Sequence, residues 1–211
     1  MTDWDTNYRE TPNVFGDDPA PMLKRHSHLV AGDLPILDVG CGQGRNSFFL
    51  ARLGHEVHAL DPSRVAVGQT AAVAETEGLR ISTQAGVLDE VPQPADGFGA
   101  IMVFGLIPIL TRAEIDDMVA SIESLIGPGG LLFITAFTTE DPKFVAHGRD
   151  AESPNYDHGS HTYLEPGELR SLFSDWQVVE FWEGLGPEHR HGDGPVERHG
   201  LAEAVFRRSE Y

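Results

Sequence analysis

Three glycines that alternate with other residues form the stretch best suited to contact a ligand. Gly40, Gly42 and Gly44 follow a short apolar run that ends near Asp38. Glycine permits positive φ and lets a ligand approach the backbone without a Cβ in the way. Residues 47–53 then carry apolar side chains at helical spacing, so a helix N-terminus should follow the loop. Its unpaired N–H groups suit an anionic or polar ligand group.

The spacing of these glycines indicates which class of nucleotide the loop could bind. A dinucleotide fingerprint would have the form G-x-G-x-x-G, and a phosphate loop would end in Gly-Lys-Ser/Thr. The chain has neither, because its glycines are spaced by single residues. With no pyrophosphate to hold, the loop suits a nucleoside whose tail is an amino acid, and a plain tight turn is the alternative.

A second acid, Asp61, ends the next expected strand, about twenty residues past the glycine loop. A carboxylate at that position can accept hydrogen bonds from both hydroxyls of a ribose. An alternative role is that of a helix N-cap before Pro62. The two roles are compatible, so the capping role leaves the ligand role open.

The pattern Asp38-x-Gly40-x-Gly42-x-Gly44 resembles the first motif of the class I S-adenosylmethionine-dependent methyltransferases. The resemblance implies S-adenosylmethionine as cofactor. It also implies a cofactor site that includes these four residues and the following: Asn46, Asp61, Val87, Leu88 and Phe104.

The adenine end of that site departs from the class pattern. In this class an acid commonly precedes the fourth strand and holds the adenine amino group. Here the position falls on Val87, while Asp89 lies two residues later. Either backbone groups near Val87 and Leu88 hold the adenine, or Asp89 reaches in from a shifted loop.

Further segments are similar to one branch of the class, the tellurite-resistance methyltransferases. They are the loop 40–47, the stretch 163–176 and the stretch 186–190. Members of that branch methylate tellurium or selenium oxyanions, and relatives act on thiols or other small soft nucleophiles. The resemblance implies that His189 and Arg190 face the substrate and are catalytic. Arg190 would hold an oxyanion by paired hydrogen bonds, and His189 would donate to it or remove a proton.

Strands and helices that alternate along the chain must position these residues. Alternation of this kind favours a parallel sheet, and two final strands, 176–183 and 201–208, form a hairpin that makes the last strand antiparallel. The prediction is an α/β fold: a Rossmann-like, doubly wound sheet of seven strands in the order 3-2-1-4-5-7-6, with helices on both faces. The ligand should lie at the carboxyl ends of the first two strands.

The chain divides into an N-terminal arm and one methyltransferase domain. Residues 1–33 are expected to be irregular up to about residue 20 and then helical from Pro21 to about Val30, and they either anchor the N-terminus or form a lid. Residues 34–211 form the domain. Within it, residues 138–163 form a long polar loop near the substrate site.

Composition limits the partners. Asp and Glu number 33 against 15 Lys and Arg in 211 residues, a formal charge of −18. Such a charge repels nucleic acid and anionic membranes, so a small molecule is the expected substrate. No apolar run reaches the roughly 18 residues that span a bilayer, and a lone cysteine excludes an internal disulfide, which favours the cytoplasm. Oligomeric state is not predicted.

Histidines in the last third of the chain suggest an alternative chemistry. Imidazole and carboxylate groups bind Zn, Ni, Fe or Mn, but surface loops of an acidic protein also carry solvated histidines. We expect no metal. The histidines concerned are His158, His161, His189, His191 and His199. Alternatives to a soft nucleophile remain: a natural-product hydroxyl or amine as acceptor, with or without metal, and a non-catalytic module that binds S-adenosylmethionine or metal.

Overall fold

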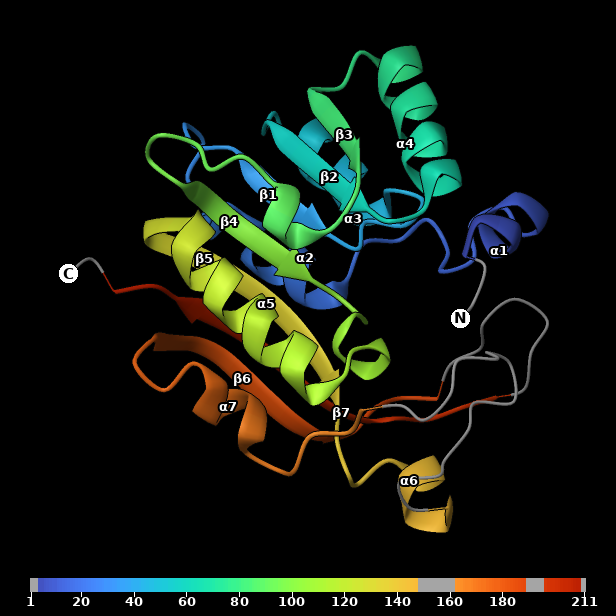
Figure 1. Ribbon diagram of the computed structural model, residues 1–211, viewed down its shortest axis with the longest axis vertical. Helices are drawn as coiled ribbons and strands as arrows, with labels where there is room; N and C mark the ends of the chain where they lie inside the picture. The colour runs from blue at the N-terminus through green and yellow to red at the C-terminus, as the bar shows by residue number, and fades with distance from the viewer. Residues whose placement is uncertain (1–3, 148–161, 189–195, 210–211) are drawn as a thin grey trace.

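The protein folds around a seven-stranded sheet with helices on both faces (Figure 1). The structure is a computed structural model that describes residues 4–147, 162–188 and 196–209. The sheet order is β3-β2-β1-β4-β5-β7-β6, and β7 runs antiparallel to β5 and to β6. The predicted order and the antiparallel last strand are therefore confirmed. The strands are β1 Ile36–Val39, β2 Val57–Asp61, β3 Ile81–Ala85, β4 Phe98–Val103, β5 Ile126–Phe137, β6 Gln177–Leu185 and β7 Gly200–Arg207.

Two hydrophobic clusters fill the space between the sheet and its helices. Ile101 and Val103 of β4 belong to the cluster that also contains buried residues of α5 and α7. Ala100 and Met102, on the opposite face, pack with residues of α2 and α3. Successive strand residues point to opposite faces, so a strand buried on both sides is apolar throughout. The helices are α1 Trp4–Glu10, α2 Pro21–His26, α3 Arg45–Arg52, α4 Arg64–Glu77, α5 Arg112–Leu125, α6 Pro142–His147 and α7 Glu168–Leu172.

One edge of the sheet collects the ends of several strands. The glycine loop follows β1, Asp61 ends β2, and Phe137 ends β5. Because β7 is antiparallel to β5, its beginning reaches the same edge, where Leu201 pairs with Phe137. Residues that precede β7 therefore lie beside residues that follow the parallel strands.

Three segments differ from the sequence-based expectations. The start of the arm is helical in α1, not irregular, and α1 packs against α4. Helix α6 occupies part of the expected loop 138–163, of which residues 148–161 lie outside the described residues. The sequence Gly-Pro-Gly-Gly at residues 127–130 predicts a helix end and a turn. It lies instead within strand β5, which begins at Ile126, because it exchanges backbone hydrogen bonds with Arg208.

Candidate active site

The three glycines of the loop adopt positive φ angles, a conformation that glycine allows and other residues rarely adopt. Gly40, Gly42 and Gly44 have φ values of +69°, +52° and +86°. A Cβ at Gly44 would lie 2.8 Å from the Phe48 ring and 2.9 Å from the Thr70 side chain. Only glycine fits there, so the loop can turn sharply from β1 into α3.

Asp38 lies beneath this loop and ties β1 to α3. Its carboxylate accepts a hydrogen bond of 2.6 Å from Ser47 Oγ. Burial raises the pKa of Asp38 to about 6, although the hydrogen bond from Ser47 favours the charged form. Asp38 is not among the residues that line the neighbouring cavity, so its predicted contact with the cofactor stays a prediction.

Asp61 joins the end of β2 to the glycine loop. Its Oδ2 accepts from the Gly42 N–H at 2.8 Å, and its Oδ1 accepts from the Ser63 N–H at 2.8 Å. Burial raises its pKa from the ordinary value. The N-cap of α4 is Ser63, whose hydroxyl accepts from the Ala66 N–H, so Asp61 is not the cap. Each carboxylate oxygen has a second lone pair, which leaves Asp61 able to accept from a ligand.

The other predicted cofactor residues divide into two groups. Asn46 and Phe104 line the cavity beside the glycine loop, and Asn46 Oδ1 accepts from the Ala20 N–H. Val87, which is 56% exposed, and Leu88, which packs against the core, do not line it. Asp89 accepts a hydrogen bond from Ser121 of α5. The predicted roles of Val87 and Leu88 remain predictions.

A cavity of about 800 Å³ lies along this edge of the sheet. Its size falls in the range of small-molecule sites. The glycine loop and Asp61 line one end, and Phe137, Tyr163 and His199 line the other. A separate hollow of about 630 Å³, beside Arg112, shares no lining residue with it. The cavity therefore joins the predicted cofactor residues to a second region that could hold another molecule.

The N-terminal arm covers the cofactor end of the cavity. Tyr8 is buried, its ring stacks on Trp4, and its hydroxyl lies 3.0 Å from the position that a Cβ on Gly42 would take. Asp5 accepts hydrogen bonds from the Ser63 hydroxyl and the Val65 N–H of α4. The arm is anchored on the domain by these contacts, and its movement as a lid stays a prediction.

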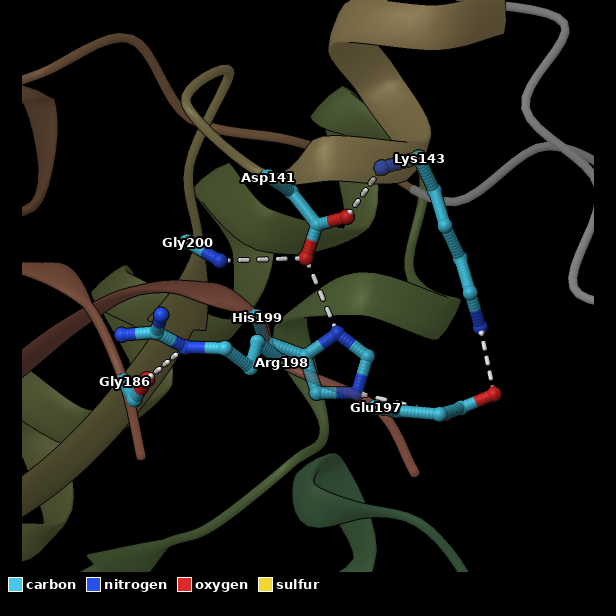
Figure 2. A network of polar contacts seen from close by, with 7 residues as sticks. All are labelled: Asp141, Lys143, Gly186, Glu197, Arg198, His199 and Gly200. Carbon is cyan, nitrogen blue, oxygen red and sulfur yellow. Dashed lines mark hydrogen bonds and ion pairs between the residues drawn. The ribbon is translucent and has the colours of Figure 1, made fainter. Parts of the chain in front are cut away.

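The sequence did not predict most of the residues at the end of the cavity that Phe137, Tyr163 and His199 line. His199 stacks on Phe137 with ring centroids 4.4 Å apart, and its Nδ1 lies 2.9 Å from a carboxylate oxygen of Asp141 (Figure 2). Burial and the charge of Asp141 raise the pKa of Tyr163 to about 12. Asp141 carried no sequence signal, since it is 58 residues from His199.

The predicted catalytic pair, His189 and Arg190, lies outside the described residues. The same holds for His158, His161 and His191. Within residues 4–147, 162–188 and 196–209, no group of three or more His, Cys, Asp or Glu side chains could hold a metal ion. Over the same ranges, no helix combines the length and the apolar character needed to cross a bilayer.

The residues around the glycine loop fit S-adenosylmethionine. The cofactor end offers a buried carboxylate with unused lone pairs for the ribose and a loop whose lack of Cβ atoms lets a ligand contact the backbone. Residues 36–130 match the methyltransferase domain family. The match and the sheet order make this chain similar to the class I S-adenosylmethionine-dependent methyltransferases.

Within that class, the chain is similar to the TehB-like branch. It is 28% identical to the probable S-adenosyl-L-methionine-dependent methyltransferase TehB of Haemophilus influenzae over 158 residues, 74% of this chain and 50% of that protein. It is 29% identical to hemagglutinin 1 of Eikenella corrodens over 154 residues, 72% of this chain and 47% of that protein. The chain thus spans about half the length of these curated relatives.

Solved structures have the same fold. The crystal structure of TehB from H. influenzae matches with a TM-score of 0.76 at 19% identity, covering 98% of this chain and 67% of that one. A structure described as "Conversion of a Disulfide Bond into a Thioacetal Group during Echinomycin Biosynthesis" matches with a TM-score of 0.74 at 20% identity. The match covers 98% of this chain and 91% of that one. At these identities the likeness establishes the fold.

Proposed function

We propose that this protein transfers a methyl group from S-adenosylmethionine to a small soft nucleophile, a thiol or a tellurium or selenium oxyanion. The observation that carries the proposal is the continuous cavity, which has the glycine loop and Asp61 at one end and aromatic and titratable side chains at the other. Such a cavity can hold a cofactor and an acceptor together. The similarity to TehB supports the choice of acceptor.

We assign the binding and orientation of S-adenosylmethionine to the cofactor end of the cavity. When bound, S-adenosylmethionine supplies a sulfonium methyl group that is already activated toward displacement. Asp61 would accept hydrogen bonds from the ribose, and Asn46 and Phe104 would line the site beside it. The arm, through Trp4 and Tyr8, would exclude water. Positioning of this kind, with reacting atoms about 3 to 3.5 Å apart, provides much of the catalysis in such a displacement.

The acceptor end needs groups that hold and orient the nucleophile. We assign this role to His189 and Arg190, on the resemblance of residues 186–190 to the tellurite-resistance branch. Arg190 would bind an oxyanion through two parallel N–H donors. His189→Ala and Arg190→Ala should each lower turnover by about 100-fold or more, and unchanged turnover in both would refute the assignment.

Cellular location and partners are part of the proposal. We place the protein in the cytoplasm because its one cysteine, Cys41, is buried and cannot form an internal disulfide. The net charge of −18 opposes binding to nucleic acid. A small molecule remains the proposed partner.

The test is methyl transfer from labelled S-adenosylmethionine to tellurite, selenite, small thiols and phenols. It is run with and without a chelator, with volatile products collected. Turnover on chalcogens or thiols that a chelator does not change is the expected result. Turnover on phenols alone would favour a natural-product acceptor. Cofactor binding without turnover would favour a binding module, and loss of turnover with chelator would favour a metal site.

A further inference from the structure

A buried carboxylate and an imidazole face each other at the acceptor end of the cavity. Asp141, between β5 and α6, is fully buried, and His199, just before β7, is 7% exposed. Figure 2 shows Asp141 between the His199 ring, the backbone of Gly200 and the backbone of Lys143. Its Oδ2 contacts His199 Nδ1 at 2.9 Å and accepts from the Gly200 N–H at 3.1 Å, while Oδ1 accepts from the Lys143 N–H at 2.8 Å.

Local packing holds this pair in one geometry. A Cβ on Gly200 would lie 2.3 Å from the Asp141 nitrogen, so the glycine allows the start of β7 to lie directly against the Asp141 backbone. The Phe137 ring stacks on the imidazole with an interplanar angle of 17°. The ring can neither tilt nor turn without breaking these contacts.

The carboxylate also selects the tautomer of the ring. An ionised carboxylate only accepts hydrogen bonds, so His199 Nδ1 carries the proton that it donates to Asp141. In the neutral imidazole the proton-accepting lone pair is then on Nε2. An oriented imidazole of this kind is the usual form of a general base.

Charged groups from three segments surround His199. Glu197 Oε2 lies 3.7 Å from His199 Nε2, which is too long for a hydrogen bond, and Lys143 Nζ forms an ion pair of 3.1 Å with the other oxygen of Glu197. Among the described residues, Asp141 and its neighbour Tyr163 are further titratable groups in this region, and Arg198 donates to the Gly186 carbonyl. Two carboxylates near the ring stabilise the imidazolium that forms when Nε2 accepts a proton.

We propose that His199, oriented by Asp141, is the general base that removes the proton from the acceptor X–H group during methyl transfer. The inference deepens the proposed function and rests on it. The X–C bond forms as the S–C bond of the sulfonium breaks. The electron pair of the broken bond stays on sulfur, and the X–H proton moves to His199 Nε2, leaving an imidazolium beside Asp141 and Glu197.

The same surroundings narrow the class of acceptor. Glu197 lies 3.7 Å from the His199 ring and is paired with Lys143, and both Glu197 and Glu203 line the cavity. Tellurite and selenite are anions at neutral pH and would be repelled by these carboxylates. A neutral acceptor that carries an ionisable X–H group, a thiol or a phenol, is therefore favoured over tellurite or selenite.

The test compares two thiols of different acidity in wild-type protein and in His199→Asn. The amide that this substitution introduces can still donate to Asp141 but lacks a base at the position of Nε2. We expect kcat/KM with 2-mercaptoethanol, which is protonated at neutral pH, to fall about 100-fold or more. With 4-nitrothiophenol, which is already ionised, we expect a change below about threefold. His28→Gln, at an exposed histidine away from the cavity, is the matched control.

A measurement on wild-type protein keeps the inference testable if His199→Asn fails to fold. The ¹⁵N spectrum of the His199 ring should show the Nδ1–H tautomer, and a ring protonated on Nε2 alone would overturn the inference without any activity assay. Equal loss of kcat/KM with both thiols, or no loss with either, would also overturn it. Wild-type protein that binds S-adenosylhomocysteine but methylates no acceptor would overturn the proposed function, and the base with it.

Discussion

The two ends of the cavity are built in different ways. At the cofactor end, interacting residues are close in sequence: Ser47 lies 9 residues from Asp38, and Asp61 lies 19 residues from Gly42. At the acceptor end, His199 lies 58 residues from Asp141, and Glu197 lies 54 residues from Lys143. The residues proposed to hold the cofactor thus form a short motif, whereas the residues proposed to face the acceptor come from distant segments.

The difference follows from the topology of the sheet. One strand–loop–helix–strand unit contains the glycine loop and Asp61, and parallel pairing of β1 with β2 brings both to one edge. The acceptor end depends on the pairing of β5 with β7, which joins residues 64 to 76 positions apart through antiparallel hydrogen bonds. Substitutions at one end should therefore alter cofactor binding, and those at the other should alter acceptor chemistry.

The largest expected effect concerns the pH dependence of stability, in which the buried carboxylate Asp38 at the cofactor end should differ from the buried carboxylate Asp141 at the acceptor end. Asp141 accepts several N–H groups, whereas burial raises the pKa of Asp38 from 3.8 to about 6. Folded Asp38 therefore binds its proton more tightly than unfolded Asp38 does. The contribution of Asp38 to the free energy of unfolding should therefore fall as pH rises from about 4 through 6, by about 3 kcal/mol.

Asp38→Asn removes the loss of stability that comes from ionising this buried carboxyl group, because asparagine does not titrate. The free energy of unfolding from urea titrations, variant minus wild type, should rise by about 3 kcal/mol between pH 4 and pH 8. Asp33→Asn, on the exposed turn before β1, is the matched control. A difference for Asp38→Asn that stays constant with pH would contradict the prediction.

The next effect concerns cofactor affinity. Asp61→Asn keeps the shape of the side chain but loses the charged acceptor, so S-adenosylhomocysteine should bind about 2 kcal/mol more weakly, roughly 30-fold, by calorimetry. Asp89→Asn is a control of the same chemistry, because Asp89 bonds Ser121 and does not line the cavity. We expect it to alter affinity by no more than about twofold.

Either of two results would contradict the division of the cavity into a cofactor end and an acceptor end. The first is an Asp61→Asn protein that binds cofactor normally but has a raised KM for the acceptor. The second is an effect of Asp89→Asn as large as that of Asp61→Asn, which would place Asp89 at the adenine. Thermal unfolding of both variants separates loss of affinity from loss of fold.

The smallest effect tests whether the arm belongs to the cofactor end. Tyr8→Phe removes only the hydroxyl that lies against Gly42, and we expect cofactor affinity to fall by about 1 kcal/mol, roughly fivefold. The KM of the acceptor should stay unchanged, since Tyr8 lies against Gly42, whereas His199 contacts Phe137 and Asp141. A change in acceptor KM at constant cofactor affinity would instead assign the arm to the acceptor end.

Much of the fold was predictable because local rules govern it. Apolar strands, helix stops and the capping box of α5, in which Thr111 and Glu114 exchange hydrogen bonds, follow from nearby residues. The errors have tertiary causes. Helix α1 forms where polar residues predicted an irregular arm, because Asp5 and Tyr8 are held by contacts with α4 and the glycine loop.

The sequence alone indicated the alternation of strands and helices, the glycine loop and the position of Asp61, because each depends on residue types within a few dozen positions. The sheet order was expected from the resemblance to a known class of fold. Only the tertiary structure decided that Asp141 and His199 meet. Their contact requires β7 to pair antiparallel with β5 and Gly200 to lie against the turn before α6. No local pattern encodes such a contact, since its energy depends on which strands become neighbours when the core packs.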